Sequence, residues 1–237
     1  MQYFGGKQKI AKPLSQFLNS QLKNDQAFYD LFCGSCNVVS KIDPNRNRYA
    51  NDLKKELIAM WEYLQKGGTL PNTVSEEEYQ DIMINRNTNK YPDWYKAFVG
   101  FGCSYSGKYF AGYARNSSSR NYAMSAKNST EKKFQTMNDV IFSSGNYFDV
   151  NLKPKSLLYC DIPYKNTVGY SVGHFEHQKF YTWAETKSKE GHSVFVSEYK
   201  DNLPKGWKII FEIESRKYIR NKDGQQVLTS EIVMTPN

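Results

Sequence analysis

The stretch Phe28-Tyr29-Asp30-Leu31-Phe32-Cys33-Gly34-Ser35-Cys36 decides the fold. Its first five residues are apolar or aromatic apart from one acid, which predicts a buried strand over 28–32. A tight turn with Gly34 follows, and we predict that a helix starts between Ser35 and Asn37. A strand, a turn and a helix N-terminus in this order favour a ligand site at the carboxyl end of the strand, because the free N–H groups of the helix face it.

The rest of the chain alternates helical and strand patterns. Apolar residues at helical spacing predict helices over 10–22, 53–64 and 176–189. The short apolar runs predict strands at 49–52, 140–142, 156–160 and 192–197. Two further strands, 207–213 and 226–234, flank Asp223-Gly224, which is a turn signal of β-hairpins. We therefore expect an α/β fold whose mostly parallel sheet ends in an antiparallel C-terminal hairpin.

Asp52 follows the second predicted strand at a distance that has a functional meaning. It lies 22 positions after Asp30. In nucleotide-binding βαβ units an acid about 20 residues beyond the glycine turn binds the ribose hydroxyls. The same position also suits a residue that caps the helix predicted from Leu53. The two roles are compatible, and the sequence leaves both open.

Composition limits the class of protein. The 237 residues suffice for one α/β domain with an insertion, and the net charge is 32 − 24 = +8. A basic balance is only a weak sign of a polyanionic partner. Four scattered cysteines do not form the framework of a secreted disulfide protein. We find no apolar run of membrane-spanning length and no signal-peptide core at the N-terminus, so we expect a cytoplasmic protein without a membrane partner.

Residues 70–140 differ from the rest of the chain. Their helical periodicity is weak, and Asn, Ser, Gly and Tyr dominate. From Trp94 to Thr130 there is no Asp or Glu, whereas five cations and nine aromatic residues are interleaved. Cations beside aromatic rings suit phosphate contacts and base stacking. The stretch is therefore either a nucleic-acid-binding lobe or a polar lobe that happens to lack acids.

The sequence Asp161-Ile162-Pro163-Tyr164 follows the apolar strand predicted at 156–160. Asp161 offers a carboxylate, and the carbonyl of Ile162 is a second hydrogen-bond acceptor. Pro163 stiffens the loop, and Tyr164 presents a flat ring. Two acceptors beside a ring suit the exocyclic amino group of a base. An ordinary turn after a strand is the alternative, because Asp and Pro are common in turns.

These motifs together resemble a known family. Asp30-Leu31-Phe32-Cys33-Gly34-Ser35-Cys36 resembles the Phe-x-Gly-x-Gly motif of S-adenosylmethionine-dependent methyltransferases, with Cys36 in place of the second Gly. The segment 161–164 resembles their Asp-Pro-Pro-Tyr motif, with Ile162 in place of the first Pro. Phe4-Gly5-Gly6-Lys7 resembles the N-terminal motif of Dam-type DNA adenine-N6 methyltransferases. The order of the motifs also matches that group, and the resemblance extends over nearly the whole chain.

The resemblance implies a fold and an activity. The fold is a Rossmann-like methyltransferase domain formed by 1–55 and 141–237, with an inserted target-recognition lobe at 56–140. The activity is methyl transfer from S-adenosylmethionine to N6 of a flipped-out adenine in double-stranded DNA, without a metal. We expect a monomer or a weak dimer in the cytoplasm of a bacterial or phage-infected cell, in a setting such as restriction-modification.

The resemblance also implies roles for individual residues. The catalytic residues are Asp161, Ile162, Pro163 and Tyr164, and Tyr164 stacks on the target base. Asp30 and the backbone around Gly34 bind the methionine portion of the cofactor, and Asp52 binds the ribose. The whole set implied at the cofactor is Phe4, Gly6, Lys7, Asp30, Phe32, Cys33, Gly34, Ser35, Asp52, Asn146, Tyr147 and Asp161. The set expected at the DNA is Lys108, Tyr109, Arg115, Arg120, Arg216 and Lys217.

Other functions stay open. Cys33-Gly34-Ser35-Cys36 is a Cys-x-x-Cys at a strand-to-helix turn, which is the setting of thioredoxin-like thiol oxidoreductases. That function leaves the motif at 161–164 unexplained. A methyltransferase-like DNA-binding protein that has lost turnover is the non-enzyme alternative. Methylation of RNA or of a protein amide nitrogen is possible as well, because related motifs serve those amino groups.

Overall fold

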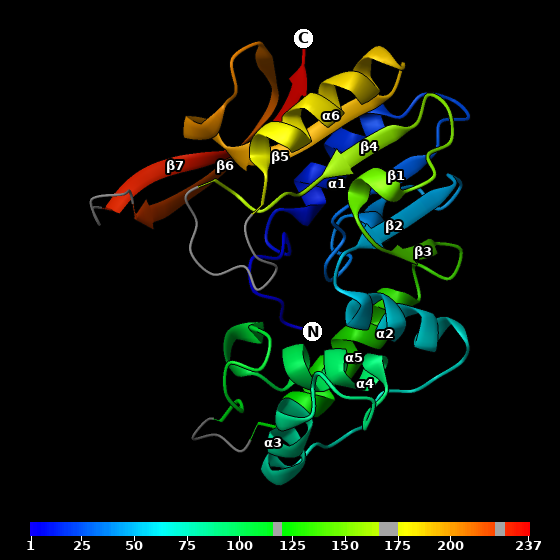
Figure 1. Cartoon of the computed structure of the whole chain (residues 1–237), viewed down its shortest axis with the longest axis vertical. Helices are drawn as coiled ribbons and strands as arrows, with labels where there is room; N and C mark the ends of the chain where they lie inside the picture. Colours follow the sequence, from blue (N-terminus) through cyan, green and yellow to red (C-terminus); the bar gives the residue numbers. More distant parts are fainter. Residues whose placement is uncertain (116–119, 166–174, 221–225) are drawn as a thin grey trace.

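A computed structural model describes residues 1–115, 120–165, 175–220 and 226–237, and excludes the side chains of 214–220 and 226–229. Five strands pair in parallel at the centre of the molecule (Figure 1). They are β1 (Phe28–Asp30), β2 (Arg48–Asp52), β3 (Ile141–Ser144), β4 (Leu157–Cys160) and β5 (Ser193–Tyr199). Their positions agree with the predicted strands to within a few residues.

A long hairpin completes the sheet. It consists of β6 (Trp207–Arg220) and β7 (Gln226–Pro236), and β7 runs antiparallel to both β5 and β6. The strand order is β3-β2-β1-β4-β5-β7-β6 over the described residues. The predicted α/β fold with an antiparallel C-terminal hairpin is therefore confirmed. The order reverses between β1 and β4, and in such sheets this switch point is where ligands bind, beyond the carboxyl ends of the strands.

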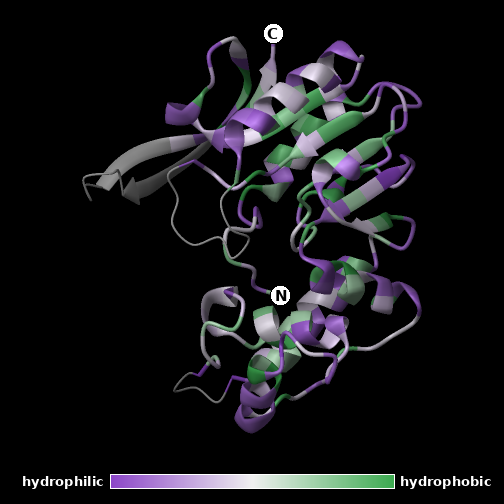
Figure 2. Cartoon of the chain, in the orientation of Figure 1, coloured by the Kyte–Doolittle hydropathy of each residue, from purple (hydrophilic) through white to green (hydrophobic). Residues whose placement is uncertain are grey.

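The alternation of side chains along each strand builds two cores. Tyr29, Leu158 and Val194 face helix α6 (His177–Lys189), whereas their neighbours Phe28 and Leu157 face the opposite side. Helix α1 (Ala11–Gln21) covers that opposite side with Leu14 and Leu18. Figure 2 shows the hydrophobic residues gathered along the strands between these helices. A sheet that is buried on both faces explains why its strands read as nearly continuous apolar runs.

The segment between β2 and β3 forms a helical lobe on one side of the sheet (Figure 1). Its elements are α2 (Lys55–Gln65), α3 (Glu76–Ile84), α4 (Asp93–Ala97), the π-helical turn η2 (Phe98–Gly102), the short turn η3 (Tyr105–Gly107) and α5 (Tyr122–Phe134). The core of the lobe is continuous with the core under α1, because Leu57, Trp61 and Phe98 belong to the same cluster as Phe28. The proposed domain boundaries stay a prediction.

The expectation of little helix over 70–140 is wrong. Helices α3 and α5 begin at side-chain caps, where Ser75 accepts from the N–H of Glu78 and Asn121 accepts from the N–H of Met124. The buried face of α5 consists of small residues, Ala123, Ala126 and Thr130. Small residues carry a weak periodic signal, so these helices were missed.

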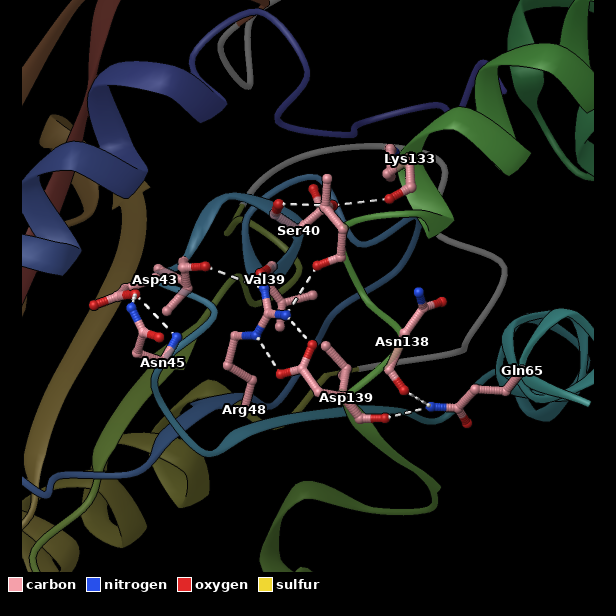
Figure 3. Close-up of polar contacts among 12 residues, drawn as sticks. Val39, Ser40, Asp43, Asn45, Arg48, Gln65, Lys133, Asn138 and Asp139 are labelled. Carbon is pink, nitrogen blue, oxygen red and sulfur yellow. Dashed lines mark hydrogen bonds and ion pairs between the residues drawn. The ribbon is translucent and has the colours of Figure 1, made fainter.

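The helix predicted to start at Ser35–Asn37 is also absent. The segment forms turns and then a short 3₁₀ helix, η1 (Val39–Lys41). Cys36 takes a left-handed backbone conformation with φ of 56°, which an α-helix does not allow. The buried guanidinium of Arg48 donates to the carbonyls of Val39 and Ile42 as well as to Asp139 and so stabilises this short segment (Figure 3).

In the part of the chain that the structure describes, no helix is long and apolar enough to cross a membrane. No three His, Cys, Asp or Glu side chains come together there in a metal-binding arrangement.

Candidate active site

One cavity lies at the switch point of the sheet. Its volume is about 380 Å³, and the segments that follow β1, β2, β3 and β4 line it together with the N-terminal segment. All of the residues that the resemblance implied at the cofactor line this cavity: Phe4, Gly6, Lys7, Asp30, Phe32, Cys33, Gly34, Ser35, Asp52, Asn146, Tyr147 and Asp161. The fold thus gathers residues up to 157 positions apart in the chain, from Phe4 to Asp161, around one space.

The N-terminal segment lies directly against the turn after β1. A Cβ atom added at Gly34 would come within 3.0 Å of the Tyr3 ring, and one added at Gly6 would come within 3.0 Å of the Asn37 side chain. Gly34 also has a φ of 47°. The two glycines therefore allow an approach between the two segments that side chains would prevent.

Cys36 occupies the position of the family's second glycine without facing the cavity. Its side chain is fully buried in the core under α1, and it is not among the residues that line the cavity. A thiol in this place leaves the space for a ligand unchanged. The substitution costs backbone strain at a positive φ, which is on the order of 1 kcal/mol for a residue with a Cβ.

The surroundings of Cys33 and Cys36 disfavour the alternative function of a thiol oxidoreductase. Cys33 and Cys36 are both free and buried. Burial raises the pKa of Cys33 well above its usual value, and the nearby Cys36 and Asp52 raise it further. A catalytic thiol needs a lowered pKa, because the thiolate is the nucleophile. This Cys-x-x-Cys motif therefore lacks the electrostatics of a redox site.

Asp30 is a buried carboxylate at the edge of the cavity. Only 2% of its surface is exposed, and its Oδ1 atom has no hydrogen-bond partner among the described residues. Burial raises the pKa of Asp30 well above its usual value, and the charges of Asp161 and Asp52 raise it further. A buried acceptor without a donor is costly, so this atom is suited to a ligand that brings a donor or a positive charge.

Asp52 holds two backbone N–H groups at the mouth of the cavity. Its Oδ2 accepts from Gly34 at 2.7 Å, and its Oδ1 accepts from Lys54 at 2.8 Å. Burial raises its pKa, whereas these two hydrogen bonds oppose the rise. Asp52 therefore joins the turn after β1 to the start of α2. This structural role exists beside the ribose role, which stays a prediction.

Asn146 faces the cavity from the segment after β3. Its Oδ1 is buried and has no partner among the described residues. The neighbouring Tyr147 ring packs at 5.3 Å from Phe32 and at 4.9 Å from Trp183. This end of the cavity thus combines an apolar wall with one unpaired acceptor.

Asp161 follows β4 and lies in an ionic network. Its Oδ1 is 2.7 Å from the Nζ atom of Lys7, which is also 2.7 Å from Oε1 of Glu231. The hydroxyl of Tyr164 donates to Glu231 at 2.7 Å and accepts from Lys7. Burial alone lowers the pKa of Lys7, but Asp161 and Glu231 outweigh this effect, so the pKa ends above its usual value. Lys7 therefore remains charged.

The four residues of the predicted catalytic motif separate in space. Asp161 and Pro163 line the cavity, whereas Ile162 and Tyr164 do not. The Ile162 side chain is buried in the core that faces α6. The Tyr164 ring is buried, lies 4.6 Å from the Tyr199 ring and carries its hydroxyl into the network of Glu231. Tyr164 therefore does not line the cavity in this structure, and its stacking role stays a prediction.

The residues expected at the DNA lie mostly on the surface of the lobe. Lys108, Arg115 and Arg120 are exposed, and Tyr109 is half-buried under the Lys54 side chain, whose Nζ is 4.0 Å from the ring centre. Arg216 and Lys217 have side chains outside the described residues, as has the hairpin turn at 221–225.

The cations of the acid-free stretch do have acidic partners. Arg115 forms an ion pair with Glu76 of α3, and Lys96 is buried with its Nζ 2.9 Å from Asp93. Both acids lie outside 94–130 in the sequence. The absence of acids within 94–130 therefore does not leave Arg115 and Lys96 unpaired, because Glu76 comes from α3 and Asp93 lies one turn before Lys96 in α4.

Sequence reasoning missed three residues that contact this site. Tyr3 covers Gly34, Glu231 binds Lys7, and Lys133 of α5 donates to the carbonyl of Ser35 at 2.7 Å and to Oδ1 of Asn37 at 2.6 Å. Glu231 did leave a signal, since a single acid in the apolar run Ile232-Val233-Met234 needs a buried partner. The sequence around Tyr3 and Lys133 carries no such signal.

A comparison with family models gives a match in the N-terminal part of this α/β chain. Residues 3–97 match the family model described as "D12 class N6 adenine-specific DNA methyltransferase". The resemblance to Dam-type adenine-N6 methyltransferases is therefore confirmed for this stretch, which contains the N-terminal motif, the turn after β1 and Asp52.

The remaining comparisons add little. A search of curated proteins finds no match. Among solved structures, SMU.472, described as "a putative methyltransferase complexed with SAH", aligns with 98% of this chain at 9% identity and a TM-score of 0.37. This chain spans about half of that one, 52% of its length. So distant a likeness carries no argument about function.

Proposed function

We propose that this protein transfers a methyl group from S-adenosylmethionine to the N6 amino group of an adenine in DNA. The observation that carries the proposal is the position of Asp161. Its carboxylate borders the same cavity as Asp30, Gly34 and Asn146, so one space offers a site for a cofactor and an acceptor for a target amino group. The family match at 3–97 supports the same substrate.

The cavity suits the proposed cofactor. Two buried acceptors there lack donors among the described residues, Oδ1 of Asp30 and Oδ1 of Asn146. S-adenosylmethionine carries donors that fit these two acceptors, the ammonium of its methionine portion and the amino group of its adenine. Asp30 would hold the ammonium and Asn146 the adenine, with the Tyr147 and Phe32 rings beside the base. Asp52, at the mouth, would hold the ribose hydroxyls.

Methyl transfer to this amino group requires hydrogen-bond acceptors rather than a strong base. The cofactor supplies a methyl group activated by a sulfonium centre. The N6 nitrogen of adenine is a poor nucleophile, because its lone pair is delocalised into the ring. Asp161 and the carbonyl of Ile162 would accept from the amino group, orient its lone pair and stabilise the positive charge that grows on the nitrogen.

The target base has to leave the DNA stack before it reaches Asp161. The rim of the cavity offers exposed apolar side chains, Phe4, Leu53 and Phe148, which are 47%, 55% and 46% exposed. Lys108 of the lobe lies over the Phe4 ring, with its Nζ 5.7 Å from the ring centre. These contacts support DNA binding across the lobe and the cavity mouth. The proposal fits a monomer or weak dimer in the cytoplasm.

The test is methyl transfer from radiolabelled S-adenosylmethionine to unmethylated double-stranded DNA, followed by nucleoside analysis. We expect label in N6-methyladenine, and none with DNA that is fully methylated beforehand. Parallel reactions contain RNA or a protein acceptor in place of DNA. Label in RNA or protein alone would replace the proposed substrate. DNA binding without label in any acceptor would support the alternative of a DNA-binding protein without turnover.

A further inference from the structure

Glu231 is a buried carboxylate on β7, which lies between β5 and β6 in the sheet. It lies in β7 beside Ile232, Val233 and Met234, and all four residues are fully buried. A buried carboxylate costs several kcal/mol unless other groups pair with it. Neither the motifs nor the family match at 3–97 assigns a role to this residue.

The partners of Glu231 connect it to Asp161. Its Oε1 lies 2.7 Å from Nζ of Lys7, and that ammonium lies 2.7 Å from Oδ1 of Asp161. One lysine thus bridges two carboxylates that belong to β7 and to the segment after β4. Only 5% of the Lys7 side chain and none of the Glu231 side chain is exposed, whereas 19% of the Asp161 side chain is. Asp161 is therefore the most exposed of the three, and Glu231 is the one that does not line the cavity.

Two carboxylates share the ammonium of Lys7. Lys7 remains charged, because Asp161 and Glu231 raise its pKa. Without the charge of Glu231, the ammonium would be free to turn fully toward Asp161. A carboxylate that holds the whole ammonium would stabilise a developing positive charge less than one that shares it, and this difference grows in a site that excludes water.

We propose that Glu231 is a positioning residue that holds the Lys7 ammonium on the β7 side of Asp161, so that Asp161 stays oriented toward the cavity and shares this ammonium with a second carboxylate. This inference rests on the proposed methyl transfer to an amino group. Glu231 does not line the cavity, so it contacts neither substrate nor cofactor and acts through Lys7. The Tyr164 hydroxyl, which donates to Glu231 at 2.7 Å, fixes the carboxylate from the other side.

The experiment replaces the charge and keeps the shape. Glu231→Gln is expected to lower kcat for methyl transfer to DNA at least tenfold, while the Kd of S-adenosylmethionine, measured by calorimetry, stays within threefold of the parent. Glu231→Asp keeps the charge on a shorter side chain and is expected to retain more turnover than Glu231→Gln. A role in folding alone would not separate kcat from cofactor binding in this way.

The matched control is Glu185→Gln on α6. Glu185 accepts from the Trp207 indole at 3.0 Å and does not line the cavity, so the control removes the same charge at another site. It is expected to leave kcat within threefold. Thermal unfolding checks that each variant folds, and Glu231→Asp serves alone if Glu231→Gln does not fold, with an expected loss in kcat of at least threefold.

The outcomes separate the two proposals. An active parent whose Glu231→Gln variant keeps kcat within threefold overturns the role of Glu231 and leaves the proposed function intact. The same holds if Glu231→Gln weakens cofactor binding as much as it lowers kcat. A parent that methylates no DNA overturns the proposed function and with it this inference.

Discussion

Three acidic residues of the sheet lie where burial makes a charge costly. Asp30, Glu198 and Glu231 are at most 2% exposed, and they lie on β1, β5 and β7. Glu231 has Lys7, and Glu198 accepts from the N–H groups of Lys165 and Tyr199, whereas Oδ1 of Asp30 has no donor in the described structure. The residue that lacks a donor is the one that borders the cavity, as expected of a group that completes its hydrogen bonds with a ligand.

Asp161→Ala tests the proposed acceptor. The change removes the carboxylate nearest to the target amino group, so we expect methyl transfer to fall about 100-fold, as when one preorganised group is removed from other active sites. Cofactor affinity, measured by calorimetry, is expected to change less than about fivefold, because Asp30 and Asn146 remain. Turnover within threefold of the parent would contradict the assignment.

Glu198→Gln tests the cost of a buried charge. Burial raises the pKa of Glu198 from 4.5 to about 7, although several hydrogen bonds oppose the rise. Between these values the folded state keeps a proton that the unfolded state has lost, so stability falls as pH rises from 4.5 to 7. Glutamine cannot ionise. The free energy of unfolding of the variant, relative to the parent, should therefore increase over this window.

Denaturant titrations at several pH values between 4 and 8 measure this difference. Glu212→Gln is the control, since Glu212 is exposed on β6 and its pKa is lowered by Ser230 and Lys200. A difference between Glu198→Gln and parent that is constant across the window would mean that Glu198 titrates normally.

At the scale of elements, hydrogen bonds join helix α5 of the lobe and the residues just after it to the turn that we propose binds the cofactor. Lys133, in its last turn, donates to Ser35 and Asn37, and burial lowers its pKa to about 8. Thr136, just beyond the helix, donates to the carbonyl of Ser40 at 2.9 Å. The turn after β1 therefore has its carbonyls satisfied by side chains of α5 and by Arg48 rather than by a helix of its own.

Lys133→Met tests this attachment. Removing two hydrogen bonds from the turn that contains Ser35 should weaken S-adenosylmethionine binding about tenfold, which corresponds to about 1.4 kcal/mol. Lys132→Met is the matched control, because Lys132 is the exposed neighbour on the same helix. Calorimetry on both variants gives the comparison. Equal affinities for the two variants would show that α5 does not support the cofactor site.

At the scale of the molecule, the lobe and the sheet enclose the N-terminal segment between them (Figure 1). Phe4 donates its N–H to the carbonyl of Gly107 at 3.0 Å, and Lys7 pairs with Asp161 and Glu231 of the sheet domain. Residues 4–7 thus contact both parts. DNA that binds the lobe would lie next to the segment that borders the cavity, which brings the target base near Asp161.

Neutralising Lys108, Arg115 and Arg120 together tests the lobe as the DNA surface. Each lost phosphate contact should reduce the log–log salt dependence of binding by about 0.9. We expect a reduction closer to two contacts than to three, because the ion pair with Glu76 competes for Arg115. Salt titrations on a target and a non-target duplex provide the slopes. The control neutralises Lys189, Lys205 and Lys208, which are exposed on the sheet domain.

A slope that is unchanged in the triple variant on both duplexes would mean that the lobe is an ordinary solvated surface. The DNA would then bind elsewhere, and the β6–β7 hairpin with Arg216 and Lys217 would be the next surface to test. A loss of sequence preference in addition to the lower slope would show that one of the three residues reads a base edge.

The sequence by itself determined the sheet, because buried strands appear as short apolar runs such as Leu157–Cys160. The resemblance of the motifs implied that Asp30, Asp52 and Asp161 belong to one site. All three line the cavity, since polar residues that follow the strands of a parallel sheet gather at one edge.

Only the tertiary structure decided how these residues are paired. Glu231 is 224 positions from Lys7 and Lys133 is 98 positions from Ser35, and no local pattern encodes such contacts. The helix predicted after Gly34 is absent, since Cys36 has a positive φ, and distant Lys133 donates to the carbonyl of Ser35. Local propensity fixes which segments are strands, whereas the partners of buried charges depend on how those segments pack.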